Sequence, residues 1–287
     1  MITIAIPFFR DTDLLRKAIQ SVLSQTSAEW RLIVVDDSGA ESGRETVQAF
    51  SDPRIRYVSN LKSLGMAPNW NHCLHLADTP YATLLHADDK LEPCYVDRML
   101  AGWKANPSAA LLYCRAQIID QDGSRAFSLP DAMKSWRSHL AGEGGLDALL
   151  RGCFIFCPTV CFRRDSHGQF PQFSTDWKMV QDFDLWAKLL LAGETLVGLP
   201  FVGYAYRRHA AGATALYTQS LLRFEEEAKL YEALENRCLA KGWKSAARRA
   251  HRKTIVKLNI AYCAFTDLGR GHRAGFLEKL GFLGRVL

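Results

Sequence analysis

The segment WRLIVVDDSG (residues 30–39) joins an apolar run to two adjacent aspartates and a glycine. A second segment, YATLLHADD (residues 81–89), repeats this order, because its apolar run is followed by Asp88 and Asp89. Short apolar runs bounded by turn-forming residues are typical of buried β-strands. We therefore expect two buried strands, each of which ends at a pair of carboxylates.

Further strands are expected on both sides of these two segments, at residues 2–6, 55–59 and 111–119. Helical spacing of apolar side chains is found between the strands, at residues 13–23, 43–50, 67–77 and 93–103. Alternation of strands with helices of about ten residues predicts parallel strands joined by right-handed crossovers. In such sheets ligands bind beyond the carboxyl ends of the strands, and both aspartate pairs lie there.

The remaining sequence is irregular at first and then helical. We expect a loop or lid at residues 123–152 with a short helix at 146–150, and a strand at 153–162. A helix is predicted at 181–192 and a strand pair or bent strand at 196–206. The C-terminal part predicts three helices, at residues 220–241, 243–265 and 272–285.

The composition restricts the class of protein. The 287 residues are 48% hydrophobic and 23% charged, which is ordinary for a globular chain and excludes disorder as the main state. No apolar stretch reaches the roughly 18 residues of a spanning helix. The N-terminal segment lacks the basic leader and the apolar run of a signal peptide. We expect a cytoplasmic protein.

The net charge of +6 is unevenly distributed. Residues 241–287 contain 11 Lys or Arg and 2 Asp or Glu, which gives +9 there and −3 in the rest of the chain. A basic helix with an apolar stripe can lie on an anionic membrane surface. The alternative is a helical region that packs on the rest of the protein with a solvated basic face. Nucleic-acid binding is not expected, because no recognised binding fold accompanies the charge.

Carboxylates at two strand ends suit a site for a divalent cation and a phosphate. Mg²⁺ and Mn²⁺ prefer oxygen ligands and complete their shell with phosphate oxygens and water, and Asp88 and Asp89 offer such ligands. Asp36 or Asp37 could instead accept hydrogen bonds from a nucleobase or ribose. For either pair alone, turn formation or helix capping is an alternative.

A third acidic cluster opens the helix predicted at 181–192. Carboxylates in a first helical turn are favoured by the helix dipole, which is one interpretation of Asp182 and Asp184. Alternatively, Asp182 could act as a general base that takes the proton from an attacking hydroxyl.

Together these motifs resemble those of the family-2 glycosyltransferases, which are inverting enzymes with the GT-A fold that use nucleotide sugars. The resemblance extends from residue 3 to about residue 209. The motifs stand in the family's order: IAIPFFR (4–10), IQSVLSQT (19–26), VVDDS (34–38), GMAPNWN (65–71), HADD (86–89) and QDFDLW (181–186).

The resemblance implies a role for particular residues. Asp88 falls on the aspartate that binds the metal and the diphosphate, and Asp182 falls on the catalytic base. The implied cofactor is Mg²⁺ or Mn²⁺. The implied nucleotide-binding residues are Pro7, Phe9, Asp36, Asp37, Asn69 and Asp88. Lys62 follows the third strand and could also approach the phosphate, with a plain surface lysine as the alternative.

Two departures from the family pattern concern the metal and the base. His86 occupies the motif position at which the family usually has its first metal-binding aspartate, and an imidazole there can bind Mn²⁺ or simply pack. Gln181 occupies the position of the family's glutamate before the base. His209 is a further candidate metal ligand, with an exposed loop histidine as the alternative. The neighbouring Arg207 and Arg208 could hold the diphosphate.

We thus expect an α/β protein with the GT-A fold, a Rossmann-like mixed sheet flanked by helices, and a C-terminal helical appendage. The expected catalytic domain is 1–215, with a nucleotide-binding half (1–120) and an acceptor half (121–215), followed by a basic helical region (216–287). The implied activity is transfer of a sugar from a UDP-, dTDP- or GDP-sugar to a hydroxyl of a glycan or lipid-linked acceptor, in cell-surface polysaccharide synthesis. The basic helices offer a peripheral contact with the inner face of the cell membrane.

Two other functions are weighed against this one. A sugar-phosphate nucleotidyltransferase would want a glycine-rich phosphate loop after the first strand, and residues 7–10 (PFFR) contain no glycine. A non-catalytic relative that binds nucleotide sugars is disfavoured, because Asp37, Asp88 and Asp182 are all present.

Overall fold

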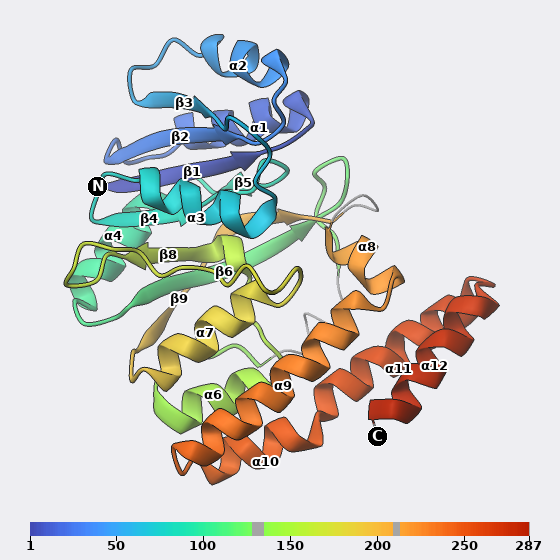
Figure 1. Cartoon of the computed structure of the whole chain (residues 1–287). Coiled ribbons are helices and arrows are strands. Elements are labelled where there is room, and N and C mark those ends of the chain that lie inside the picture. Colours follow the sequence, from blue (N-terminus) through green and yellow to red (C-terminus); the bar gives the residue numbers. More distant parts are fainter. Residues whose placement is uncertain (128–134, 209–212, 287) are drawn as a thin grey trace.

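The described residues of this computed structural model, 1–127, 135–208 and 213–286, form a nine-stranded sheet with helices on both faces (Figure 1). One short strand, β7 (His139–Leu140), pairs with β9 beside the main order. From one edge to the other, the strands are β3 (Ile55–Ser59), β2 (Trp30–Asp36), β1 (Ile2–Phe8), β4 (Tyr81–Leu84), β8 (Val160–Arg163), β6 (Leu111–Ile119), β9 (Leu196–Arg207) and β5 (Lys90–Leu91).

The N-terminal half confirms the predicted alternation of strands and helices. Strands β3, β2, β1 and β4 are parallel and are connected by α1 (Thr12–Leu23), α2 (Glu41–Gln48) and α3 (Met66–Leu76). Asp11 caps α1, because its carboxylate accepts a hydrogen bond from the backbone N–H of Leu14 at 3.0 Å. The crossovers leave the carboxyl ends of these strands at one edge of the sheet.

Beyond β4 the sheet is mixed. Strand β8 lies between β4 and β6 and is antiparallel to both, so β6 does not continue the parallel run directly. The strand predicted at 153–162 is wrong over its first part, since β8 begins only at Val160 and follows a short 3₁₀ helix, η1 (Cys157–Thr159). Pro158 within η1 has no N–H to donate to a neighbouring strand, which accounts for the late start.

Buried side chains form two clusters, one on each face of the sheet. Helices α1 and α4 (Tyr95–Ala105) cover one face, where Ile4 and Ile6 point. Helices α3, α6 (Gly142–Leu150) and α7 (Gln181–Leu191) cover the other face, where Ala5 points (Figure 1). Both faces of β1 are thereby buried, as its continuous apolar run predicts.

The C-terminal part is helical as predicted, but its helices are divided differently. The helix predicted at 243–265 is two helices, because Lys253 has left-handed backbone angles (φ 47°, ψ 30°) that an α-helix cannot continue. The segment at 196–206 is a single strand, whose pairing with β6 shifts in register between Tyr113 and Ala116. The helices are α8 (Ala213–Gln219), α9 (Leu222–Ala240), α10 (Lys244–Arg252), α11 (Thr254–Gly269) and α12 (Arg273–Val286).

Helix α9 packs against α7 of the preceding part of the chain. Its buried side chains Phe224, Leu230 and Leu234 belong to the same cluster as Phe183 of α7. The proposed division of the chain at residues 215 and 216 stays a prediction. The contacts of α9 nevertheless mean that this helix helps to fix the position of α7.

Candidate active site

Three parallel strand ends form the edge on which the candidate residues lie. Strand β1 lies between β2 and β4, and Phe9 follows it at this edge. The backbone N–H of Asp37 donates to the carbonyl of Phe8 at 2.8 Å, and the N–H of Leu85 donates to the carbonyl of Ala5 at 2.9 Å. These bonds keep the segments after β2 and β4 beside β1, so both aspartate pairs lie at one edge.

Asp36 is fully buried and holds the end of β2. Its carboxylate accepts hydrogen bonds from the N–H and hydroxyl of Ser38 at 2.7 and 2.6 Å, and from the hydroxyl of Tyr57 at 2.7 Å. Burial and the neighbouring carboxylate raise the pKa of Tyr57 to about 12, so its hydroxyl stays a donor. A Cβ at Gly43 would lie 2.2 Å from Asp36 Oδ2, so only glycine lets α2 approach this closely.

Asp37 organises the loop after β3. Burial acts to raise the pKa of its carboxyl, but the hydrogen bonds that it accepts outweigh burial and hold the pKa below its usual value. Its four donors lie at 2.7–3.0 Å and are the side chains of Asn60 and Ser63 and the N–H groups of Leu64 and Gly65.

The predicted nucleotide-binding residues surround this loop. Asn60 also donates to Asn69 Oδ1 at 2.9 Å, so the buried Asn69 belongs to the same network as Asp37. Lys62 is exposed within the loop, Pro7 is partly buried, and Phe9 is 58% exposed. The structure thus gathers these residues near the ends of β1 and β2, while their contacts with a nucleotide stay predictions.

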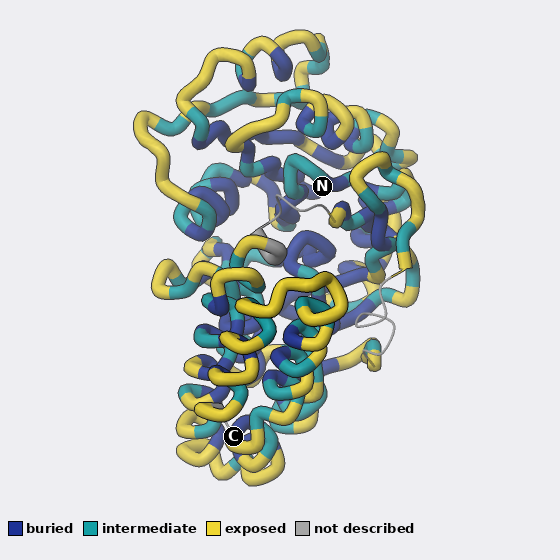
Figure 2. The backbone as a smooth tube through the Cα atoms, turned by 90° about the vertical axis from the view of Figure 1, so that its right-hand side faces the viewer, coloured by how far each residue is buried: buried dark blue, intermediate teal, exposed yellow. Residues whose placement is uncertain are grey.

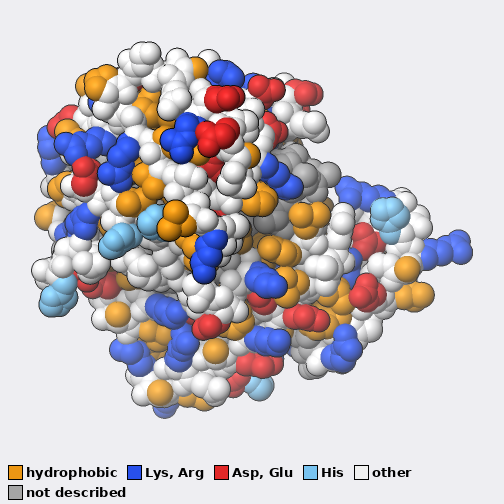
Figure 3. Space-filling view, turned by 45° about the horizontal axis from the view of Figure 1, so that its top comes forward, with side chains coloured by type: hydrophobic (Ala, Val, Ile, Leu, Met, Phe, Trp, Pro, Cys, Tyr) orange, Lys and Arg blue, Asp and Glu red, His pale blue; other side chains and the backbone are white. Residues whose placement is uncertain are grey.

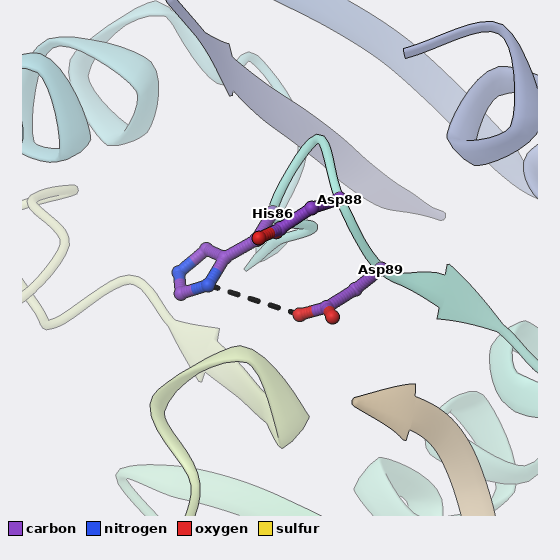
Figure 4. Close-up of side chains that lie close together, drawn as sticks. All are labelled: His86, Asp88 and Asp89. Atoms are coloured by element: carbon purple, nitrogen blue, oxygen red, sulfur yellow. Dashed lines mark ion pairs between the residues drawn. The ribbon is translucent and has the colours of Figure 1, made fainter. Parts of the chain in front are cut away.

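A cluster of potential metal ligands follows β4 (Figure 4). One ligand atom each from His86, Asp88 and Asp89 lies within 4.8 Å of the others, and His86 Nδ1 is 3.8 Å from Asp89 Oδ2. His86 and Asp88 are partly exposed, whereas Asp89 is buried. The resemblance implied His86 and Asp88 as ligands, and the sequence also offered Asp89 as an oxygen ligand. His209, the third predicted ligand, lies outside the described residues.

The donor set of this cluster fits a divalent cation of the Mg²⁺ or Mn²⁺ type. Two carboxylates and an imidazole are ligands that Mn²⁺ accepts. Burial lowers the pKa of His86, and the neutral imidazole is the form that binds metals. Within the described part of the chain, the buried Nε2 of His86 has no hydrogen-bond partner. The ring itself stacks on Trp70, with centroids 5.3 Å apart.

Residues of strand β9 donate hydrogen bonds to the metal-ligand cluster. Asp89 accepts hydrogen bonds from the hydroxyl of Tyr204 at 2.8 Å and from the N–H of Arg207 at 2.6 Å. The guanidinium of Arg207 donates to the carbonyls of Asp88, Asp120 and Gln121 at 2.7–2.9 Å. The sequence placed Arg207 near a diphosphate. In the structure its hydrogen bonds stabilise the loop at residues 86–89. Tyr204 is a residue that sequence reasoning missed, since the residues around it in β9 give no sign of its partner.

Asp182 lies in the first turn of α7 and is partly exposed. Because Thr83 of β4 pairs with Cys161 of β8, helix η1 lies beyond the carboxyl end of β4. Burial, together with the negative charge of Asp182, raises the pKa of the Cys157 thiol in η1, which reflects their proximity. Figure 1 shows that α7 begins at the end of the sheet where η1 lies, so Asp182 in its first turn is on the same edge as the metal-ligand cluster.

Asp184, the other acidic residue of this motif, has a different environment. It is 1% exposed, and its carboxylate pairs with Lys188 at 2.5 Å and with Arg237 of α9 at 3.5 Å. Asp184 thus joins α7 to α9, whereas Asp182 is partly exposed.

A second contact from α9 supports the segment before α7. The buried carboxylate of Glu226 accepts hydrogen bonds from the N–H groups of Lys178 and Met179 at 2.7–3.1 Å. Phe183 also packs edge-on against Tyr231 of α9, with centroids 5.8 Å apart. Sequence reasoning did not find Glu226, because its partners lie 47 and 48 residues away and leave no local pattern.

Comparison with known proteins gives a consistent result. The model of the family described as "Glycosyl transferase family 2" matches residues 3–169, more than half of the chain. TuaG of Bacillus subtilis, named for teichuronic acid biosynthesis, is 27% identical over 69% of this chain and 75% of its own length. WfgD of Escherichia coli, named as a UDP-Glc:alpha-D-GlcNAc-diphosphoundecaprenol beta-1,3-glucosyltransferase, is 26% identical over 66% of this chain and 70% of its own.

Solved structures are similar over nearly the whole chain. S. aureus TarS 1–349 in complex with UDP-GlcNAc matches with a TM-score of 0.65 at 12% identity, over 99% of this chain and 81% of that one. A mannosyltransferase from Pyrobaculum calidifontis in complex with GDP-Man and Mn²⁺ gives a TM-score of 0.59 at 16% identity, over 99% and 85%. At these identities the likeness concerns the fold, which is that of the GT-A glycosyltransferases, as the sequence predicts.

Proposed function

This chain belongs to glycosyl transferase family 2, and we propose that it transfers a sugar from a UDP-, dTDP- or GDP-sugar to a hydroxyl of a glycan or lipid-linked acceptor, with inversion. Its relatives act in cell-surface polysaccharide biosynthesis, and we assign it to such a pathway. We further propose that it works on the cytoplasmic side, at the inner face of the cell membrane.

One observation carries this proposal: the metal-ligand cluster and Asp182 lie on the same edge of the sheet (Figure 1). A diphosphate leaving group and an attacking hydroxyl must be within reach of one sugar carbon, so their partners on the protein must be neighbours. The ligands and acceptor in the names of the relatives and solved structures, UDP-GlcNAc, GDP-Man with Mn²⁺, and a diphosphoundecaprenol, support the same donor and acceptor classes.

The reaction would use this chain's residues in two places. Asp88, with His86 and Asp89, would hold a divalent cation, which when bound neutralises the charge that develops on the leaving diphosphate. Asp182 would accept the proton of the acceptor hydroxyl as its oxygen bonds to the anomeric carbon. Attack from the side opposite the diphosphate inverts the configuration at that carbon.

The products distinguish this function from the alternatives. Incubation with UDP-, dTDP- and GDP-sugars, Mn²⁺ and an acceptor should release a nucleoside diphosphate and give a glycoside of inverted configuration, measured by chromatography and NMR. Pyrophosphate release from a nucleoside triphosphate and a sugar phosphate would instead indicate a nucleotidyltransferase. Nucleotide-sugar binding without turnover for every donor and acceptor would indicate a non-catalytic relative.

A further inference from the structure

The outward side of the α11–α12 hairpin is an apolar surface that the other described residues of the chain leave exposed. We propose that it docks on an anionic lipid surface. This inference rests on the proposed function only in one respect, because a lipid-linked acceptor would lie in such a surface. We call this surface the outer apolar face. Its exposed side chains are Leu258, Tyr262, Phe265 and Leu268 of α11 and Leu277 and Leu280 of α12.

Helix α11 is apolar on two opposite sides. Val256, Ile260 and Ala264 are fully buried on its inner side, whereas Leu258 and Phe265 on its outer side are 60% and 63% exposed. Soluble proteins rarely expose contiguous apolar patches of this kind unless the patch binds a partner or a membrane. Packing on the neighbouring helix α9 therefore accounts for only one side of α11.

The outer sides of the two helices form one continuous surface. Leu258 and Ala261 of α11 line a hollow of about 670 Å³ together with Leu283 of α12. Farther along the hairpin, Phe265 contacts Phe276 of α12, with ring centroids 6.0 Å apart. In Figure 2 the hairpin lies on the side toward the viewer, and much of its length is coloured as exposed. Two antiparallel helices can thus lie flat on one plane.

Basic side chains flank this surface at both ends. At one end His251, Arg252 and Lys257 line the same hollow. At the other end the turn between the helices carries Arg270 and Arg273, both exposed, and Figure 3 shows Lys and Arg side chains at the projecting end of the molecule. Anionic headgroups match this arrangement, because cations at the rim meet the phosphates while the apolar side chains reach the acyl boundary.

The charge also argues against a second copy of this chain as the occupant. Residues 241–287 contain Asp267 and Glu278 as their acidic residues, and Asp267 pairs with Lys279 within the hairpin at 2.6 Å. A symmetric dimer through this face would bring two basic rims together with little negative charge to offset them. No helix in the described part of the chain is long and apolar enough to cross a bilayer. A surface-lying mode suits these helices.

Vesicle co-sedimentation of the full chain tests the proposal. We expect binding to phosphatidylcholine vesicles that contain phosphatidylglycerol, and little binding to pure phosphatidylcholine. Leu258→Ser with Phe265→Ser should weaken binding at least about tenfold, and Arg252→Glu with Arg270→Glu and Arg273→Glu should abolish the preference for phosphatidylglycerol. Matched controls are Leu239→Ser, an exposed apolar side chain on α9, and Arg16→Glu with Lys17→Glu on α1, which should bind like the wild type.

Three results would overturn the inference: no binding of the wild type to anionic vesicles, equal binding of the face variants and the controls, or a wild-type dimer in sedimentation velocity that Leu258→Ser with Phe265→Ser dissociates. Circular dichroism melting of each variant shows that the fold is kept. Because binding is measured without turnover, this experiment can fail while transfer to a water-soluble acceptor remains intact. Conversely, if the proposed transfer reaction were not observed, the result of the vesicle-binding experiment would not change.

Discussion

The two Asp-Asp pairs follow neighbouring strands of one sheet, yet the protein treats them differently. Asp36 and Asp37 are both buried, and their carboxylates accept seven hydrogen bonds from protein donors between them. In the second pair Asp89 is buried and held by β9, whereas Asp88 is partly exposed. The same dipeptide thus organises the loop after β3 in one place and leaves one carboxylate partly exposed in the other.

The acidic motif of α7 repeats this division of tasks. Asp184 is buried and joined to Lys188 and Arg237, and Asp182 is partly exposed. A buried carboxylate that loses its charge leaves its donors unsatisfied, so its replacement should cost stability. Replacement of an exposed carboxylate at the reacting centre should cost activity.

The largest effect is expected for Asp182→Asn. An amide cannot take a proton from the acceptor hydroxyl, so transfer should fall by about 10²–10⁴-fold while nucleotide affinity is retained. Turnover assays and calorimetric titration with the nucleoside diphosphate measure the two quantities. Asp184→Asn is the matched variant, and it should lower the unfolding free energy more than Asp182→Asn does. Unchanged turnover of Asp182→Asn would remove Asp182 from the role of base.

Asp88→Asn should have the next largest effect. Loss of the partly exposed ligand should reduce kcat/KM by about 10²–10³-fold, because charge neutralisation at the diphosphate is worth several kcal/mol. Calorimetry should show that Mn²⁺ no longer strengthens nucleotide binding. An equal stimulation by Mn²⁺ in the variant and the wild type would place the cation elsewhere.

Tyr204→Phe tests whether the hydrogen bond from β9 to Asp89 contributes to metal binding. The variant keeps the ring but removes the hydroxyl that donates to Asp89, so Mn²⁺ affinity should fall by about 10–100-fold. Added Mn²⁺ should restore turnover, and a loss due to misfolding would not be rescued in this way. Tyr57→Phe, which removes the hydroxyl that donates to Asp36, should leave Mn²⁺ affinity unchanged.

Asp37→Asn should have its main effect on stability and on its dependence on pH. We expect a loss of about 1–3 kcal/mol in unfolding free energy at neutral pH, since the amide cannot satisfy all four donors. The folded-state pKa of Asp37 is lowered, so its contribution is present above the unfolded-state pKa of about 4 and is lost as the pH falls through the folded value. Urea denaturation between pH 7 and pH 3 should give a flatter profile for the variant. Parallel profiles would show that Asp37 is not held as the structure indicates.

Local patterns were sufficient to predict strands β1 to β4, the helices of the N-terminal half and the positions of the acidic motifs. The apolar runs before Asp36 and Asp88 are signals that depend only on neighbouring residues. The insertion of β8 between β4 and β6 depends on pairing between distant segments, and alternation along the chain contains no sign of it. The break at Lys253 is similarly a single backbone change within a sequence of high helical tendency.

The supports of the site were beyond the reach of sequence reasoning for the same physical reason. Tyr204 and Arg207 reach Asp89 across more than 110 residues, and Glu226 reaches the segment before α7 from another helix. Such contacts are specified by the tertiary fold, so no spacing in the sequence indicates them. These contacts determine which carboxylate of each motif is buried and which stays partly exposed to solvent.

The most direct test of the account is the paramagnetic effect of Mn²⁺ on backbone amide NMR signals of the full chain. If the cation binds at His86, Asp88 and Asp89, and Asp182 shares that edge, the signals of Trp70, Asp89 and Phe183 should broaden together at low Mn²⁺. Signals from α10 should persist. Broadening near Asp89 that leaves Phe183 sharp would place the metal-ligand cluster and Asp182 in different sites and contradict the account.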